Sequence, residues 1–550
     1  MGEYVIGIDF GTLSARAVLV SLDSGKTLSE ASYTYPHGVI TDALPSGKRL
    51  SYGTALQDVR DYIEALSHTV REVISLAKIQ REAVVGIGID FTSSTVVPLD
   101  ENFTPLSMIE ELRDEPHAYV KLWKHHGAAR EADRINALAA ERGERWHARY
   151  GNRISSELAI PKILEILNEA PEIYGRAAHF AEAGDYICYL LTGEWATSAA
   201  FAGYKWLWSR EEGYPDNEFF TALDPRLSGI VGTKITNRVL MPGETVGRVS
   251  ESGAALTGLA VGTAVAAPMI DAHSPTAALN LVSEGDMMIV LGTSACHIAS
   301  FLERRDVEGI AGYVEGGVVP NLVTYEAGQT AVGDIFDWAV SRITPMEYYR
   351  EAERLGVDIH TYLSSLAERQ SVGEHGLLAL DWWNGNRSVL DDADLSGLIL
   401  GVTLDTRAED IYRALIEATA FGARVIIDRF GEYGLKVKSL TATGGIAAKN
   451  PFLMQIYSDV LCREIALAGT SQGAAFGGAV YAAVASGRYP SLEKAAERLA
   501  PPVERVYSPR PDAVRRYGFL YEKYKELYEM FGKSTELMHA LTQLKKEVKK

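Results

Sequence analysis

Short apolar runs and longer amphipathic segments alternate over the first third of the chain. Residues 4–10 (YVIGIDF) and 15–22 (ARAVLVSL) predict two strands, and residues 57–77 have the three- and four-residue apolar spacing of a helix. Residues 83–91 (AVVGIGIDF) and 95–100 (TVVPLD) predict two more strands. Strands that alternate with helices are typical of an α/β fold.

A similar pattern returns in the second half. Residues 262–270 (GTAVAAPMI) predict a strand that leads into DAHSPTAALN, and residues 287–301 (MMIVLGTSACHIASF) predict a strand, a glycine turn and a second strand. Residues 407–430 predict a helix, with Asp405 and Thr406 as candidate N-caps.

The two halves look like a duplication. When residues 9–12 are placed on residues 290–293, a strand, a Gly-Thr turn and a second apolar strand coincide in both halves. Glycine lets backbone amides approach an anion closely, and threonine adds a hydroxyl donor, so two such turns could hold a polyphosphate from opposite sides. Only the first turn carries an acid, Asp9, for a hydrated magnesium ion, because Val290 replaces it in the second.

The pentapeptide IGIDF occurs twice, and its second copy places Asp90 at the end of an apolar run. Thr92 follows this copy where Gly11 follows the first, so the bare backbone of a phosphate loop is missing. The run Thr92 to Thr95 offers short hydroxyls and amides suited to a polyol. The alternative is a buried strand in which Asp90 caps a turn.

Composition limits the class of protein. A chain of 550 residues exceeds the size of a single core, so two large domains are expected. A net charge of -18 disfavours binding to nucleic acid or anionic lipid, and the well-separated Cys188, Cys296 and Cys462 argue against disulfides or a zinc site. The sequence contains neither a long apolar span nor a recognisable signal peptide, so we expect a cytoplasmic protein without a membrane partner.

Four motifs in order, IDFGT, IDAHS, LGTSACH and ATGGIAAKNPFLMQIYSDV, resemble the FGGY family of carbohydrate kinases. The likeness runs from about Tyr4 to about Gly487. Within that family, residues 120–126 (VKLWKHH), 202–208 (AGYKWLW), 325–338 and 377–388 resemble the ribulokinases.

The resemblance implies an α/β fold of two actin-like, ribonuclease H-like domains with mixed sheets flanked by helices. We expect them at residues 1–284 and 285–500, with ATP and sugar bound in the cleft between them. Residues 501–550 are expected to form a peripheral helical extension.

The resemblance also implies a nucleotide site. Asp9 would lie near Mg²⁺, and the two Gly-Thr turns would contact the phosphates. A diglycine would lie against the adenine and ribose, followed by two polar residues. The nucleotide-contacting residues are Gly11, Thr12, Gly292, Thr293, Gly444, Gly445, Lys449 and Asn450.

For the sugar, the resemblance implies contacts from Lys205 and Glu326, with Ser93 or Ser94 contributing from the TSST run. Lys205 could instead be a surface residue of an aromatic segment. Glu326 could instead cap a helix that starts near Thr330.

Asp271 would be the general base that takes the proton from the attacking hydroxyl. The sequence after it predicts a helix with Ser274 as N-cap and Pro275 at its first position, and this helix N-terminus would keep Asp271 ionised. An ordinary capping acid is the alternative. The neighbouring His125 and His126 point in different directions on a helix and lack a third ligand at suitable spacing, which argues against a metal site.

These features together predict ATP-dependent phosphorylation of a ketopentose, L-ribulose above others, to its 5-phosphate in arabinose breakdown. A xylulokinase or a D-ribulokinase is the near alternative. A chaperone-type or filament-forming ATPase of the same superfamily is the distant one. The sequence leaves open whether the protein forms a homodimer.

Overall fold

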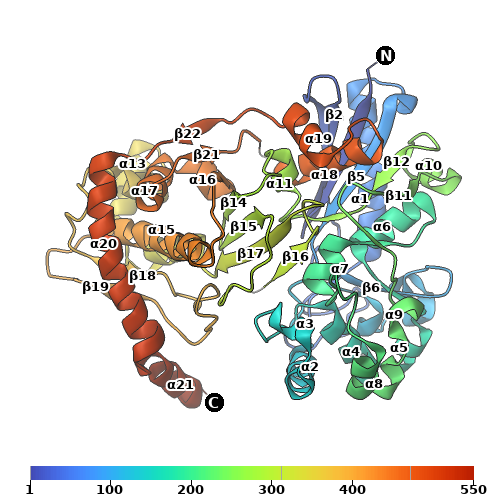
Figure 1. The fold of residues 1–550 in the computed structure, drawn as a ribbon, viewed down its shortest axis with the longest axis horizontal. Coiled ribbons are helices and arrows are strands. Elements are labelled where there is room, and N and C mark those ends of the chain that lie inside the picture. The colour runs from blue at the N-terminus through green and yellow to red at the C-terminus, as the bar shows by residue number, and fades with distance from the viewer. Residues whose placement is uncertain (1, 311, 471, 550) are drawn as a thin grey trace.

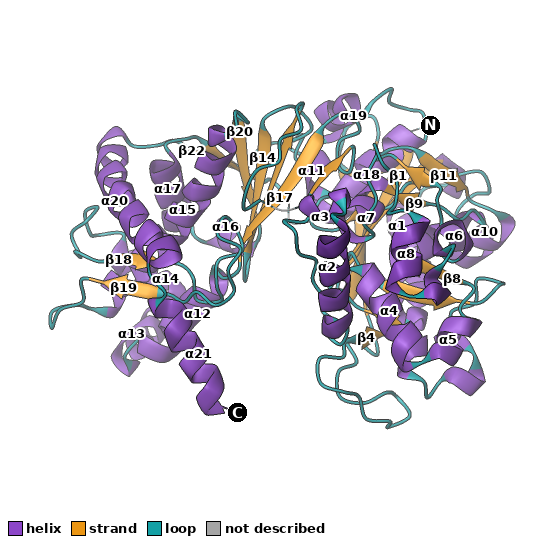
Figure 2. Ribbon diagram, turned by 60° about the horizontal axis from the view of Figure 1, so that its bottom comes forward, coloured by secondary structure: helices purple, strands orange, loops and turns teal. Residues whose placement is uncertain are grey.

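The computed structural model describes residues 2–310, 312–470 and 472–549. Two seven-stranded mixed sheets lie in separate lobes, each flanked by helices, as Figures 1 and 2 show. This arrangement confirms the expected two-lobed α/β fold. Among the described helices, none combines the length and apolarity needed to span a bilayer.

The first sheet has the order β11-β12-β5-β1-β2-β3, with β13 also paired to β5. β1 runs antiparallel to β2 and parallel to β5, and β5 runs parallel to β12. Its strands are β1 (Tyr4–Phe10), β2 (Ser14–Ser21), β3 (Thr27–Thr34), β5 (Val84–Phe91), β11 (Thr245–Arg248), β12 (Ala264–Ala266) and β13 (Met269–Ile270).

The second sheet has the order β16-β17-β15-β14-β20-β21-β22, with the same directions around its centre: β14 is antiparallel to β15 and parallel to β20. The Gly-Thr turn therefore joins the corresponding hairpin in each sheet, which confirms the duplication. Its strands are β14 (Asp286–Leu291), β15 (Ala295–Phe301), β16 (Tyr313–Glu315), β17 (Val323–Gln329), β20 (Ser439–Thr443), β21 (Ile465–Leu467) and β22 (Arg505–Tyr507).

Helices cover both faces of the first sheet. Side chains alternate along β1, so Phe10 faces α1, where it meets Tyr62 with ring centroids 6.4 Å apart, whereas Gly7 faces α18. The helices around this sheet are α1 (Val59–Ala77), α6 (Ala183–Thr192), α10 (Glu251–Thr257), α11 (Pro275–Ala278), α18 (Gly473–Ala485) and α19 (Leu492–Leu499).

Helix α18 follows a strand of the second sheet but packs against β1 and β5 of the first (Figure 1). A Cβ at Gly7 would lie 1.7 Å from the carbonyl oxygen of Ala475, and one at Gly88 would lie 2.0 Å from that of Gly478. Gly7 and Gly88 are partners in the β1–β5 register. The repeated IGIDF pentapeptide thus supplies the two glycines that let the helix approach the sheet.

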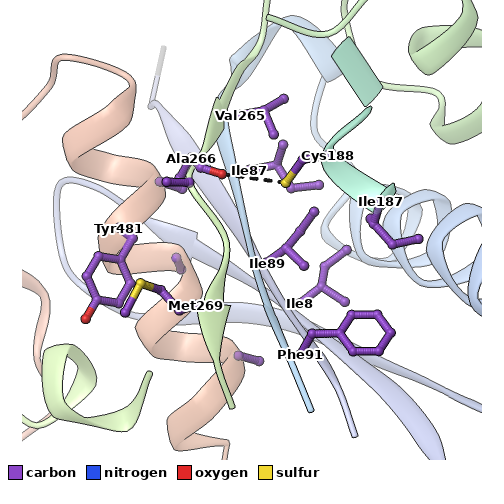
Figure 3. Close-up of a cluster of buried hydrophobic side chains, with 14 of the residues drawn as sticks. Ile8, Ile87, Ile89, Phe91, Ile187, Cys188, Val265, Ala266, Met269 and Tyr481 are labelled. Atoms are coloured by element: carbon purple, nitrogen blue, oxygen red, sulfur yellow. Dashed lines mark hydrogen bonds between the residues drawn. The ribbon is translucent and has the colours of Figure 1, made fainter. Parts of the chain in front are cut away.

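The core on either side of β5 is apolar. Figure 3 shows Ile8, Ile89 and Phe91 close together on the side of Ile187, and Tyr481 of α18 beside Met269. Most of these side chains are fully buried. This packing fixes the carboxyl ends of β1, β5 and β13, where the acidic residues of the site lie.

A smaller layer is built mostly from the segment after β5, and β4 joins it from before α1. A four-stranded sheet of order β4-β7-β6-β8 packs with several helices around a separate apolar cluster. The elements are β4 (Leu56–Gln57), β6 (Val96–Leu99), β7 (Val120–Lys121), β8 (His179–Glu182), β9 (Thr197–Ser198), β10 (Val239–Leu240), α2 (Ala129–Arg142), α3 (Arg145–Ala148), α4 (Ala159–Glu169), α5 (Pro171–Arg176), α7 (Ala199–Lys205), α8 (Asn217–Leu223) and α9 (Ile230–Thr233).

The second lobe is mostly helical outside its sheet. Its remaining elements are β18 (Leu378–Leu380), β19 (Leu398–Leu400), α12 (Gly333–Trp338), α13 (Met346–Leu355), α14 (Ile359–Ala367), α15 (Ala408–Glu432), α16 (Gly445–Lys449), α17 (Pro451–Leu461), α20 (Pro511–Glu529) and α21 (Leu537–Lys549).

Helix α20 is not peripheral, contrary to the expectation for residues 501–550. Tyr517, Tyr521, Tyr524 and Tyr528 lie on one face of this helix and are buried in the second core. The hydroxyl of Tyr524 donates to Asp381 at 2.9 Å. The sequence showed the helix but not the partner that covers its tyrosines.

Two element boundaries differ from the sequence prediction. The strand expected over 262–270 is split into β12 and β13, with Pro268, which has no N–H to donate, between them. The N-cap of α15 is Arg407, not Asp405 or Thr406, and the side chain of Asp410 accepts the Arg407 N–H at 2.7 Å.

Candidate active site

Two aspartates meet at the carboxyl ends of β1 and β5, because Asp9 and Asp90 are partners in the parallel register. Burial raises the pKa of Asp9. Asp90 is fully buried, and neither of its oxygens has a hydrogen-bond partner among the described residues. Burial, with the nearby charges of Asp9 and Asp271, holds the pKa of Asp90 well above its usual value. Asp90 therefore neither caps a turn nor faces open solvent.

Asp271 lies at the same edge of the sheet. It follows β13, which runs parallel to β5, and its N–H donates to the carbonyl oxygen of Phe91 at 3.0 Å. Its own Oδ1 accepts the N–H of Ala272 at 2.7 Å. Burial first, and then the charge of Asp9, raise the pKa of Asp271 to about 7.

The expected helix N-terminus does not keep Asp271 ionised. Helix α11 has only four residues, too short for a substantial dipole, and the pKa of Asp271 rises instead of falling. Ser274 precedes the helix as predicted, but its hydroxyl does not cap it. That hydroxyl donates to the carbonyl oxygen of Ala474 at 2.8 Å, which ties the site to α18.

In both Gly-Thr turns the glycine N–H donates to a carbonyl oxygen of the same turn, but the first turn is one residue longer: Phe10 pairs with Ala15, whereas Leu291 pairs with Ala295. Gly11 donates its N–H to the carbonyl oxygen of Ser14 at 3.0 Å, and Gly292 donates to that of Ser294 at 2.9 Å. The Thr12 hydroxyl is within 3.2 Å of the Trp123 indole nitrogen, which donates to it. Each turn closes a hairpin, and because its first residue is glycine, no side chain shields the backbone there.

A cavity of about 840 Å³ opens next to the second turn. Five of the residues expected at the nucleotide line it: Gly292, Thr293, Gly445, Lys449 and Asn450. Gly444 precedes them with φ of 102°, and a Cβ there would lie 2.4 Å from the carbonyl oxygen of Leu291, so only glycine fits. Gly11 and Thr12 are not part of this cavity's lining.

Other lining residues carried no signal in the sequence. His360 of α14 lies 3.1 Å from the Tyr412 hydroxyl of α15, and both side chains line the cavity. The side chain of Asn450 is engaged at both ends, accepting the Leu453 N–H and donating to Ser364. Asn450 therefore shapes the wall of the cavity and also caps α17.

Glu326 lies on β17 and has polar side-chain partners from both lobes. Its Oε1 accepts from the Arg387 guanidinium at 2.7 Å, and its Oε2 is 3.3 Å from Nε2 of His273. Burial alone would raise the pKa of Glu326, but the charges of Lys205 and Arg387 hold it well below its usual value. Glu326 is therefore not a helix cap. Arg387 and His273 were not predicted as site residues.

Lys205 ends α7 and faces the acidic cluster, since its charge lowers the pKa of both Asp271 and Glu326. It is not an isolated surface lysine. Ser93 is half-buried, and Ser94 is buried in the left-handed region, with φ of 59°. The TSST run thus ends in a strained turn next to the strand that carries Asp90.

The paired histidines lie in a loop, not on the expected helix, and both ring nitrogens of His125 have protein partners. His125 is buried, with Nε2 2.8 Å from Glu165, and its Nδ1 accepts the Ala55 N–H. Across the described part of the chain, no group of three or more His, Cys, Asp or Glu side chains is arranged to hold a metal ion.

Comparisons with known proteins agree with this geometry. The N-terminal domain of the FGGY family of carbohydrate kinases matches residues 4–277, and the C-terminal domain of that family matches residues 287–486. A protein named ribulokinase from Bacillus licheniformis is 46% identical over 538 residues, which cover 97% of this chain and 98% of that one. A ribulokinase from Geobacillus thermodenitrificans is 46% identical over 96% of this chain and 95% of its own.

Solved structures show the same fold. The xylulose kinase from Rhodospirillum rubrum superposes with a TM-score of 0.80 at 23% identity, over 98% of this chain and 100% of that one. The glycerol kinase from Plasmodium falciparum, solved with ADP, superposes with a TM-score of 0.75 at 16% identity, over 96% and 98%. The chain belongs to the FGGY family of carbohydrate kinases and is a sugar kinase.

Proposed function

We propose that this protein is a ribulokinase, which transfers the γ-phosphoryl group of ATP to the 5-hydroxyl of L-ribulose. The observation that carries the proposal is the approach of Glu326, from the second sheet, to the segment of Asp271. Glu326 lies 3.3 Å from His273, two residues after Asp271, and the charge of Lys205 lowers the pKa of both Asp271 and Glu326. The near-full-length similarity to proteins named ribulokinase supports the choice of sugar.

Asp271 acts as the general base. As the 5-hydroxyl oxygen bonds to the γ-phosphorus, the hydroxyl proton passes to a carboxylate oxygen of Asp271, and the bond to the β-γ bridging oxygen breaks to release ADP. A base works best when its pKa lies near the working pH, and burial brings the pKa of Asp271 to about 7. Most of the remaining catalysis is positioning, as is usual for phosphoryl transfer.

The 840 Å³ cavity takes the nucleoside. Gly445, Lys449 and Asn450 line it, as do Gly292 and Thr293 of the second Gly-Thr turn. The polyphosphate passes from there toward Gly11 and Thr12 on the first sheet. Glycine in both turns lets backbone amides contact phosphate oxygens.

Asp9 would hold the magnesium ion that accompanies ATP. The residues present fit such an ion: the carboxylate of Asp9 is half-buried at the end of β1, and the described residues contain no group of three or more His, Cys, Asp or Glu that could hold a metal without phosphate and water oxygens. When bound, the ion neutralises charge on the phosphates. Asp90 is the partner of Asp9 in the β1–β5 register, and burial with the charges of Asp9 and Asp271 raises the pKa of Asp90, which favours the neutral form beside Asp9.

Lys205 and Glu326 bind sugar hydroxyls, and Ser93 or Ser94 contributes from the end of β5. Glu326 is kept ionised by Lys205 and Arg387, which suits it to accept hydrogen bonds from hydroxyls. Domain closure over the cleft excludes water, which would otherwise compete as the phosphoryl acceptor.

An ADP-release assay over a panel of sugars tests the proposal. L-Ribulose should raise ATP turnover far above the sugar-free rate, and omission of magnesium should abolish the effect. D-Ribulose and D-xylulose serve as the near alternatives, and an unfolded peptide serves as the alternative for a chaperone-type ATPase. Preference for another pentulose would change the substrate, and no stimulation by any sugar would refute the kinase assignment.

A further inference from the structure

A buried acid and a buried lysine hold one backbone turn from opposite sides. Glu182 of β8 accepts the N–H of Ser94 at 2.9 Å and the N–H of Thr95 at 2.8 Å. Lys162 of α4 donates to the carbonyl oxygen of Ser94 at 2.6 Å. The exposed fractions of Lys162 and Glu182 are 0% and 1%. We call these two residues the Ser94 clamp.

The Ser94 clamp also forms hydrogen bonds with two further segments, at Trp206 and at Leu122. Glu182 accepts the indole N–H of Trp206 at 2.7 Å, and Trp206 directly follows Lys205. Lys162 donates a second bond, 2.8 Å long, to the carbonyl oxygen of Leu122. Two side chains from different elements thus connect the serine turn, the 120–126 segment and the lysine at the end of α7.

A merely stabilising role does not account for this arrangement. A buried carboxylate and a buried ammonium group are costly, and an apolar pair of similar volume commonly serves a core as well. Burial raises the pKa of Glu182 and lowers that of Lys162 to about 7, as expected for charges in a poor solvent. Ser94 adopts a left-handed conformation that a non-glycine residue keeps only when its surroundings impose it.

We propose that Lys162 and Glu182 are positioning residues that set sugar selectivity by fixing the serine turn relative to Lys205. They touch no substrate themselves and act through the backbone of Ser94 and the indole of Trp206. This inference rests on the proposed function, because it assumes that the serine turn and Lys205 contact the sugar.

Glu182→Gln and Lys162→Met test the proposal. Glutamine keeps the shape of Glu182, but its NH2 group replaces one oxygen that accepts from Ser94, Thr95 or Trp206. Methionine removes the two hydrogen bonds that Lys162 donates to the carbonyl oxygens of Ser94 and Leu122. We expect the KM for L-ribulose to rise at least about tenfold in each variant, because small misplacements of binding groups are costly. The preference for L-ribulose over D-xylulose should fall, whereas the KM for ATP should stay the same.

Glu417→Gln is the matched control. Glu417 is equally buried, at 2% exposure, and accepts from Arg413 and from Tyr517, both at 2.8 Å, but it lies in the second core away from the sugar. This variant should melt at a lower temperature and keep the KM values of the wild type for sugar and ATP.

Several results would overturn the inference. One is a clamp variant that melts lower, like Glu417→Gln, but retains the wild-type KM and sugar preference. Another is an equal rise in the KM for ATP, which would indicate general loosening of the fold. If neither clamp variant folds, Trp206→Phe decides, because it removes one clamp bond: an unchanged KM for L-ribulose would then refute the proposal. Failure of the wild type to use L-ribulose would instead refute the proposed function.

Discussion

Replacement of Asp271 by asparagine tests the centre of the mechanism. Asparagine has nearly the same shape and can still accept the Ala272 N–H, but it cannot take a proton. General-base catalysis contributes about 10² to 10⁴ in rate, so turnover should fall by that factor. The affinity for ATP should hardly change, because the substitution lies at the acceptor end of the site.

The same substitution should stabilise the protein above neutral pH. The pKa of Asp271 is raised from 3.8 to about 7 in the folded state. The favourable contribution of Asp271 to the free energy of unfolding is therefore complete below pH 4 and is lost as pH rises through 7. About three pKa units correspond to at most about 4 kcal/mol. Asparagine stays neutral, so the variant should melt higher than the wild type at pH 8, with the difference shrinking toward pH 4.

Turnover, ATP affinity and melting temperature should be measured on one preparation across this pH range. Asp381→Asn provides a control, because Asp381 is also buried with a raised pKa but bonds Gln329 and Tyr524 in the second core. It should leave turnover near that of the wild type. A folded Asp271→Asn variant with more than about a tenth of wild-type turnover would remove Asp271 from the mechanism.

Four further substitutions test the nucleotide end, the sugar end and the packing of α18. Asp9→Asn should weaken the binding of magnesium-ATP, whereas Asp90→Asn should act mainly on folding or sugar affinity. Titration of both variants with magnesium-ATP measures the difference, and equal losses of affinity would contradict the prediction. Glu326→Ala should weaken sugar binding by about 1 to 3 kcal/mol and leave ATP binding unchanged, as calorimetry with each ligand can show. Gly88→Ala should lower the free energy of unfolding by about 1 to 3 kcal/mol or more, and so lower the melting temperature, because the added methyl would lie 2.0 Å from the carbonyl oxygen of Gly478. An unchanged melting curve would mean that α18 does not pack against β5 at this position.

Local features were readable from the sequence. The β1–β2 and β14–β15 hairpins follow from apolar runs joined by a Gly-Thr turn, and their equivalence predicted the two matching sheets. The position of Asp271 after a short strand was also readable. These features depend on neighbours in the chain, which is the information that a residue pattern contains.

Features that join distant segments were not readable. The raised pKa of Asp271 depends on burial by several elements, which outweighs the four-residue helix beside it. The bond from Arg387 to Glu326 depends on the path of a loop, and the bonds of Lys162 and Glu182 depend on backbone groups that no side-chain pattern reveals. For the same reason the burial of the α20 tyrosines was missed.

The position of α18 has a consequence for how the chain can fold. This helix is made after most strands of the second sheet, yet it fills the face of the first sheet that Gly7 and Gly88 leave open. During synthesis one face of the central strands of the first sheet therefore stays uncovered until α18 has been made. A fragment that ended at residue 284 would keep that face exposed and would tend to aggregate. The first sheet is therefore complete only when a helix that follows a strand of the second sheet has packed against it.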